Sequence, residues 1–515
     1  PMLAFANRGK NLFLHPHWRL QTESWLVQAM QPFGGAWQSC SDLGNFAPNL
    51  GYLAVQKYFL PDSPGVDFVF RNHPLVSSGD LTAIIKDGNE AQWILPVARN
   101  KNDTRDKAIE AAIAINDGNE KTFFDTNRGS LYARTGWGTN DLVLHVDCRT
   151  DATFANHDHP DRGQFTLAAL GRAWACDGYR DTESKYHNVV TIDGRGQGYF
   201  TPPGDWISFS DTNGIVNAAV DSKYCWDWRW MKSSFTESEE SLKKRDHGGF
   251  WESAKLLQER VPLSLWEPDP KVAAYYTGFS DREHGDPRMW DDEDAWVLRA
   301  PWYPVQKAFR TVILSREKHP YVLVADDIRK DDSEHLYEWM MQTGENTDVV
   351  WAKDGDIILC DATVSRDDPG QPKPKKGDRL LLVRVLNANV PAKPGDYPTK
   401  PSFRLETFER KDTVVPEEKT PKGALSGSRS YGLDRRLVIA SRSASPDFRI
   451  LLYPLRQGDP MPVTEWDASR EAITLKAGGA QGAGGVTDRI SLAASADGRT
   501  RVSVSRNGGP DLKLP

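Results

Sequence analysis

Long apolar runs and clustered basic residues are both absent from this 515-residue sequence. A membrane-spanning helix needs about 18 or more consecutive apolar residues, so we expect no such span. Lys and Arg number 64 against 71 Asp and Glu, which gives a formal net charge of −7. A lysine run interrupted by proline occurs once, at 373–376 in a proline-rich loop, so the sequence does not indicate a nucleic-acid-binding protein.

Cysteine is also scarce, with five residues that form no CxxC pair. The odd count predicts no complete disulfide framework and leaves the cellular compartment open. The first residues lack the charged and then apolar segments of a signal peptide. Position 1 is Pro, and we therefore expect further residues upstream of this sequence. No internal repeat recurs at a fixed period.

Tryptophan, in contrast, is abundant, with 18 residues. Many tryptophans stand beside charged residues, as in "YCWDWRW" at 224–230, which contains Trp228. Aromatic rings flanked by polar groups suit a carbohydrate cleft, because the apolar faces of sugars stack on them. Large aromatic side chains are more often part of half-buried cores, so this pattern alone leaves both interpretations open.

Hydrophobic periodicity divides the chain into a helical part and a longer β part. Residues 1–120 show helical spacing and predict short helices, whereas 121–345 and 346–515 show alternating spacing with turn residues between short runs. A Trp-rich, acidic and partly helical stretch at about 205–300 interrupts the strands and reads as an insertion. The predicted fold class is α+β, with an N-terminal helical domain followed by antiparallel β-sandwich domains.

Histidines and acidic residues gather around the stretch "NHDHPDRGQF" at 156–165. His157, His159 and Asp161 are spaced two apart, which places them on one face of an extended strand. Asp177 and His187 follow at the ends of later strand-like runs. If these strands are hairpin neighbours, His159, Asp177 and His187 can converge as a zinc site, with manganese or nickel as alternatives. The same spacing also fits three unrelated polar residues at strand ends.

Several motifs together resemble the heparinase II/III-type polysaccharide lyases. The motifs that carry the resemblance cover roughly residues 121–345 and read "LYARTGW", "DLVLHVD", "NHDHPDRGQFTLAALGRAWACDGY", "YHNVVTIDG" and "KAFRTVILSREKHPYVLVADDI". The segment "DLGNFAPNLGYLAVQKYFL" resembles the last helices of the (α/α) toroid that precedes the β-domain in that superfamily. The resemblance implies a partial toroid at 1–120, a central β-domain and a C-terminal β-sandwich.

The resemblance also assigns roles to individual residues. His157 would be catalytic, and His159, Asp177 and His187 would hold a structural metal, usually zinc. Asp177 fits the ligand pattern better than Asp161, which we expect to cap the turn before "GQF". Tyr52 matches the catalytic tyrosine of the late toroid helices.

One family feature has no counterpart in this sequence. Relatives carry an Asn or Asn-His pair on an upstream toroid helix, where it neutralises the carboxylate of the uronate. Either those residues lie upstream of this sequence, or local groups replace them, such as His15, His17 or Arg19 in "LHPHWRLQ". The short interval between Asp177 and His187 predicts a more open cleft at that point.

The activity that the resemblance implies is a carbon–oxygen lyase reaction on an anionic polysaccharide. The enzyme removes the C5 proton of a uronic acid and expels the C4 oxygen, which requires a base, an acid and donors that neutralise the carboxylate. Tyr52 or Tyr199 would act as acid or base beside His157. Arg134 would be either a carboxylate clamp or a surface charge of the sheet, and Trp137 and Trp228 are candidate substrate contacts. The resemblance also implies a secreted or periplasmic location, and a homodimer is compatible with it.

Three other functions remain open at this level. A glycoside hydrolase needs two carboxylates across a cleft, and "MWDDEDAW" at 289–296 offers candidates. A metal hydrolase would use a water activated on zinc held by His159 and Asp177. A carbohydrate-binding module would depend on the tryptophans and would have no turnover.

Overall fold

The computed structural model describes most of the β part of the chain and short pieces of the first 72 residues. The described residues are 8, 14–16, 25–30, 53, 56, 60, 62–72, 121–126, 128–150, 159–177, 183–198, 201–232, 260–262, 296–343, 347–361, 363–367, 370–388, 401–409, 433–478, 485–507, 509 and 512–513. Every strand pair among them is antiparallel, as the alternating sequence pattern predicts. No helix in these segments is long and apolar enough to span a bilayer.

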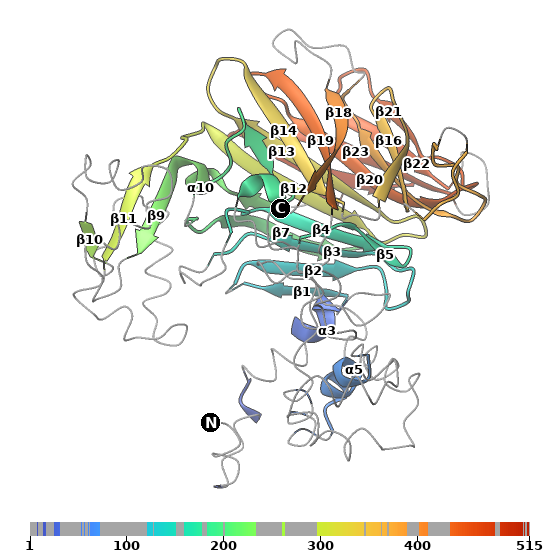
Figure 1. Cartoon of the computed structure of the whole chain (residues 1–515), viewed down its shortest axis with the longest axis horizontal. Helices are drawn as coiled ribbons and strands as arrows, with labels where there is room; N and C mark the ends of the chain where they lie inside the picture. Colours follow the sequence, from blue (N-terminus) through green and yellow to red (C-terminus); the bar gives the residue numbers. More distant parts are fainter. Residues whose placement is uncertain are drawn as a thin grey trace.

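An eight-stranded sheet forms the middle of the molecule (Figure 1). In spatial order its strands are β15 (Thr347–Lys353), β16 (Asp356–Asp361), β17 (Arg379–Val385), β20 (Phe448–Arg456), β13 (Tyr321–Arg329), β12 (Lys307–Ser315), β8 (Ile215–Asp221) and β7 (Asp205–Thr212). This sheet runs across the domain boundary predicted at residue 345, because β13 pairs directly with β20. It also takes in β7 and β8, which lie in the first part of the predicted insertion.

Two smaller sheets cover one face of this central sheet. The first follows chain order and contains β1 (Thr122–Asp125), β2 (Ser130–Arg134), β3 (Val143–Asp147), β4 (Gln164–Ala169) and β5 (Arg172–Ala175). The second has the order β18 (Ser402–Glu409), β19 (Leu433–Ser443), β14 (His335–Gln342) and β6 (Val190–Ile192). Segments from both ends of the β part therefore share one layer.

A third layer covers the opposite face of the central sheet. It contains β21 (Val463–Trp466), β22 (Ala472–Ala477), β23 (Val486–Ala494), β24 (Thr500–Arg506) and β25 (Leu512–Lys513). A separate three-stranded sheet projects from the side of the sandwich and contains β10 (Arg260–Pro262), β11 (Trp296–Pro301) and β9 (Trp228–Lys232) (Figure 1). The part of the predicted insertion that leaves the sandwich thus begins after β8.

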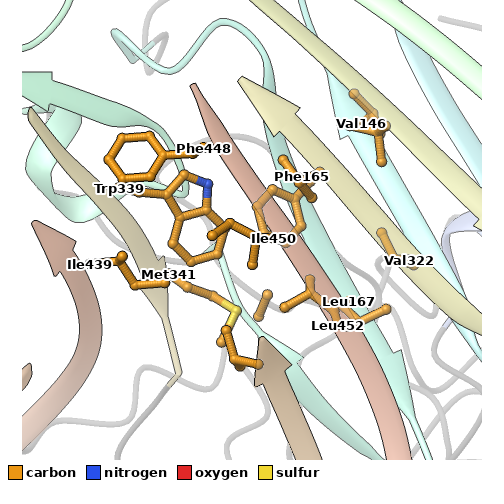
Figure 2. Close-up of a cluster of buried hydrophobic side chains, with 14 of the residues drawn as sticks. Val146, Phe165, Leu167, Val322, Trp339, Met341, Ile439, Phe448, Ile450 and Leu452 are labelled. Carbon is orange, nitrogen blue, oxygen red and sulfur yellow. The ribbon is translucent and has the colours of Figure 1, made fainter. Parts of the chain in front are cut away.

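Alternation along each strand builds two hydrophobic cores, one on each face of the central sheet. In β13, Val322 and Val324 enter the first core, whereas Tyr321 and Leu323 enter the second, between the central sheet and the C-terminal layer. Figure 2 shows part of the first core, where Trp339 of β14 packs beside Phe165 of β4 with ring centroids 5.9 Å apart. Because both faces of the central sheet are covered, strands such as β13 carry apolar residues at consecutive positions, 321–325.

Few helices lie among the described residues. They are α3 (Leu26–Ala29), α5 (Pro64–Asn72), α10 (Lys223–Asp227) and the 3-10 turn η4 (Ser184–Tyr186). In Figure 1, α3 and α5 lie on the side of the β1–β5 sheet that faces away from the sandwich, and Trp25, just before α3, packs edge-on against Tyr132 of β2. The antiparallel sandwich is confirmed, whereas the predicted toroid at 1–120 falls mostly outside the described residues.

Candidate functional site

A buried cluster of histidines and carboxylates lies where β4 begins and β5 ends. His159 and Asp161 precede β4, Asp177 follows β5, and His187 follows η4. Each of the four residues is at most 4 % exposed. Antiparallel pairing of β4 with β5 brings the residues before β4 close to those after β5. The convergence expected from hairpin-neighbouring strands is therefore present.

The distances define a compact set of metal-ligating groups. His159, Asp161 and His187 each offer a ligand atom, and these atoms all lie within 4.8 Å of one another. The two imidazole rings are 4.9 Å apart between centroids. Asp177 Oδ1 lies 2.9 Å from His187 Nδ1, whereas Asp161 Oδ2 lies 3.8 Å from the same nitrogen.

The position of Asp161 differs from the expectation. The sequence motif assigned the carboxylate ligand to Asp177 and expected Asp161 only to cap a turn, but Asp161 also lies in the cluster. The cause is a tight turn, in which the Asp161 N–H donates to the carbonyl of His159 and the Gln164 N–H donates to the carbonyl of Asp161. Gly163 adopts φ +83°, a conformation that glycine tolerates best. The turn folds Asp161 back beside His159, so both carboxylates reach the site.

The donor set fits a divalent cation. Two imidazoles and a carboxylate are ligands that zinc prefers, and manganese and nickel accept them as well. Burial raises the pKa of Asp161, against the opposing effect of His187 and Arg162. A cation at this position would favour the charged form of the carboxylates and so offset the cost of burying them.

Gln164, the first residue of β4, links the two carboxylates. Its Nε2 donates to Asp161 Oδ2 at 2.7 Å and to Asp177 Oδ2 at 2.9 Å. Arg162 forms an ion pair with Asp161 Oδ1 at 3.3 Å and also donates to the carbonyl of His159 at 3.1 Å. Each carboxylate is therefore held by more than one donor.

A buried arginine joins this site to the central sheet. Arg310 of β12 forms a two-point ion pair with Asp326 of β13, with N–O distances of 2.6 and 3.0 Å. Its Nη1 donates to the carbonyls of Gly163 at 2.8 Å and of Asn188 at 2.5 Å. These carbonyls belong to the two loops that carry Asp161 and His187, so Arg310 ties both loops to one rigid support.

A second set of polar contacts joins the same loops at the outer side. Ser184 Oγ donates to the carbonyl of Pro160 at 2.5 Å and accepts the Gln197 N–H at 2.9 Å. The Gln197 carboxamide bonds both the N–H and the carbonyl of Arg162, at 2.8 and 2.7 Å. The segments around residues 160, 184 and 197 thus form one hydrogen-bonded unit around the cluster.

The sheet face that leads away from this cluster is unusually polar. The cross-strand register places Ser130 opposite Asp147 and Tyr132 opposite His145, while Leu131 and Val146 enter the first core. His145 is fully buried, its Nε2 lies 2.8 Å from Ser130 Oγ, and its ring stacks on Tyr132 with centroids 4.2 Å apart.

Sequence reasoning missed His145 and Tyr132 as members of this face. The signal was available, because "SLYAR" and "LHVD" alternate polar and apolar residues in runs that are buried throughout. Burial lowers the pKa of His145 to about 4, against a raising effect of Asp147. The imidazole is therefore neutral near pH 7.

Arg134 and Trp137 lie where the sheet meets the helical pieces. The Arg134 guanidinium is buried and donates to the carbonyls of Gln28 at 2.5 Å and Met30 at 3.0 Å, at the end of α3. It also lies 3.9 Å from the centre of the Trp137 ring, which packs edge-on against Phe68 of α5. In this structure the pair joins the sheet to the helices, and its predicted part in substrate binding stays a prediction.

The other predicted site residues are distributed as follows. His15 is exposed, and Trp228 is half-buried at the start of β9, in the sheet that projects from the sandwich. Both stay predictions as substrate contacts. Five further predicted or rival features fall outside the described residues, namely His157, Tyr52, Tyr199, the pair His17 and Arg19, and the acidic run at 291–294.

Comparison with known proteins gives a distant structural likeness. No family model matches the chain, and no curated protein matches it. Among solved structures, it is similar to the heparan sulfate lyase HepC from Pedobacter heparinus, with 12% identity and a TM-score of 0.42 over 91% of this chain and 60% of that one. It is also similar to a heparinase III, with 10% identity and a TM-score of 0.40 over 96% of this chain and 62% of that one.

These neighbours are polysaccharide-degrading lyases, but the likeness is weak and partial. The chain spans about 60% of the length of the solved structures that it matches. At this identity and TM-score the match says nothing about activity or substrate, so the function must be argued from the residues of this chain.

Proposed function

We propose that this protein is a polysaccharide lyase that cleaves a uronic-acid-containing polysaccharide by β-elimination. The observation that carries the proposal is the buried cluster in which His159, Asp161 and His187 can offer ligand atoms and Asp177 lies 2.9 Å from His187 Nδ1. The family motif requires His159, Asp177 and His187 to meet, although they lie on separate strands and loops. The motif also puts His157 only two residues before His159 in the sequence.

A zinc ion is the proposed cofactor, with manganese or nickel as alternatives. His159 and His187 would hold it together with a carboxylate from Asp161 or Asp177. When bound, the ion supplies positive charge that stabilises the buried carboxylates and fixes the loop before β4. In this proposal the metal is structural and does not contact the substrate.

In this proposal the reaction itself falls to residues other than the metal ligands. His157 would accept the C5 proton or donate a hydrogen bond to the uronate carboxylate, since a neutral imidazole can do either near pH 7. Tyr52 would supply the second acid–base group, with Tyr199 as the alternative tyrosine. His15, His17 and Arg19 would neutralise the substrate carboxylate, which makes the C5 proton easier to remove.

An anionic polysaccharide is therefore the proposed partner. Trp137 and Trp228 would stack on the sugar rings, and Arg134, beside Trp137, would add positive charge. A polymer of this kind does not cross membranes freely. We therefore include a secreted or periplasmic location in the proposal.

An ultraviolet assay tests the proposal directly. β-Elimination creates an unsaturated uronate, which absorbs in the ultraviolet, whereas hydrolysis creates reducing ends without that chromophore. The full chain is incubated with a panel of uronate polymers, including heparan-type chains, alginate, glucuronan and ulvan. New reducing ends without the absorbance band on every polymer would exclude the lyase and favour a hydrolase.

Two histidine variants connect the activity to the site. His157→Ala should lose at least 100-fold in turnover, the lower range for loss of a general acid or base. His319→Gln, on the turn between β12 and β13, serves as a matched control and should keep full activity. Full activity in His157→Ala would refute the role of that residue.

A further inference from the structure

The carboxamide of Gln164 forms hydrogen bonds to both carboxylates of the cluster. The side chain is fully buried, and its Nε2 donates one hydrogen to Asp161 and the other to Asp177. A primary carboxamide has two N–H donors, and both are engaged by carboxylate oxygens. In the reverse orientation Oε1 would face two carboxylates, so the network fixes the direction of the amide.

The two hydrogen bonds determine which carboxylate oxygens remain for other partners. On Asp177, Oδ2 accepts from Gln164, which leaves Oδ1 at 2.9 Å from His187 Nδ1. On Asp161, Oδ2 accepts from Gln164 and Oδ1 faces Arg162 at 3.3 Å. An N–H group that donates to a carboxylate oxygen requires a lone pair there, so Gln164 holds the Oδ2 atom of each carboxylate in a fixed position.

Without an intervening donor, two buried carboxylates this close would repel each other and move apart, which would disturb their arrangement around a cation. Gln164 offsets that repulsion with two donors and adds no charge of its own. It also begins β4, whose register with β3 and β5 is set by backbone pairing. The backbone of Gln164 is therefore held by the sheet, through its pairing with Asp147 of β3.

We propose that Gln164 is a positioning residue of the metal centre, which sets its affinity for a divalent cation by holding Asp161 and Asp177 in place. This inference rests on the metal centre in the proposed function. Partners that orient metal ligands usually contribute 10- to 100-fold to metal affinity. Gln164 contacts the carboxylates only and takes no part in the chemical step.

The test measures zinc binding to the intact chain by competition with a chromophoric chelator at fixed pH. Gln164→Met keeps the side-chain length and removes both donors, so zinc affinity should fall about 10- to 100-fold. Gln164→Asn keeps the donors but is one methylene shorter and can reach only one carboxylate, so its affinity should fall between those of Gln164→Met and the wild type. Circular dichroism and the melting temperature of the metal-free forms report whether each variant folds.

Thr166 offers a matched control two residues further along the same strand face. It is buried, and its hydroxyl has no hydrogen-bond partner among the described residues. Thr166→Val should keep zinc affinity within about twofold, because it leaves both carboxylates in place. A comparable loss in this variant would overturn the inference, since it would show a general effect of altering the strand.

Other outcomes separate this inference from the proposed function. Wild-type affinity in both Gln164→Asn and Gln164→Met overturns the positioning role, and if the Met variant does not fold, the Asn variant alone decides. A wild-type chain that binds no zinc, manganese or nickel also overturns it, whatever the ultraviolet assay shows. Conversely, loss of zinc affinity in the variants stands even if no uronate polymer is cleaved.

Discussion

Acidification should destabilise this protein through His145 by an amount that the structure allows us to work out. The imidazole is fully buried between Tyr132 and Ser130. Burial lowers its pKa from 6.5 to about 4, although Asp147 acts in the opposite direction. The folded protein therefore keeps this ring neutral at pH values where the unfolded chain protonates it.

The sign and size follow from proton linkage. Above the unfolded pKa of about 6.5 neither state carries the proton, and the full stability is present. As the pH falls below this value, the unfolded state gains a proton that the native state does not bind. The loss is about 1.4 kcal/mol per pH unit, which gives about 3 kcal/mol by pH 4, where the native ring begins to titrate as well.

Denaturant unfolding followed by tryptophan fluorescence, at a series of pH values, measures this loss. His145→Gln has no titrating ring, so the wild type should lose about 3 kcal/mol more than the variant between pH 7 and pH 4. Subtracting the variant removes the contributions of the other acids and histidines, which both chains share. Parallel stability curves for the two proteins would refute the reasoning, as would an imidazole that titrates near pH 6.5 in the native state by nuclear magnetic resonance.

Three further predictions concern buried or paired charges. Arg310→Met should lower the free energy of unfolding, measured with denaturant, by about 3–5 kcal/mol, because it leaves Asp326 as an unpaired buried charge. Adding Asp326→Leu should recover part of this loss. Additive losses in the double variant would contradict the prediction. Burial raises the pKa of Asp327, but its ion pair with Arg449 outweighs this and lowers it. The resulting stability is present above about pH 4 and lost as pH falls through the folded pKa, so melting temperatures of Arg449→Met should fall less steeply in acid. Burial lowers the pKa of His335, but hydrogen bonds to two carboxylates outweigh this and raise it. The wild type should therefore melt above His335→Gln below about pH 6.5, with a gap that closes as pH rises through the folded pKa; a constant gap would count against this ion pair.

Local patterns predicted much of the β structure. The alternating runs "SLYAR", "DLVLHVD" and "GQFTLAAL" became β2, β3 and β4, because strand formation depends on side chains a few residues apart. The arrangement of the sheets in layers could not be predicted from these local patterns. The central sheet joins β13 to β20 across more than a hundred residues of sequence, and short-range periodicity carries no information about such a pairing.

Some features of the candidate site could likewise be predicted from the sequence, whereas others depended on the tertiary structure. His159, Asp177 and His187 could be named from their spacing at strand ends, because antiparallel neighbours return to the same edge of a sheet. The place of Asp161 depended on a tight turn, and the link through Gln164 depended on which face of β4 meets the loop. Both are three-dimensional facts that the motif does not contain.

The sequence by itself therefore determined which residue types reach the cluster and which segments form strands, since both follow from composition and local alternation. Only the tertiary structure decided that two carboxylates meet there, that a carboxamide bridges them, and that Arg310 anchors both loops from the opposite sheet. The physical reason is that hydrogen bonds to buried charges act over about 3 Å. Whether two groups come that close is decided by how distant strands pack.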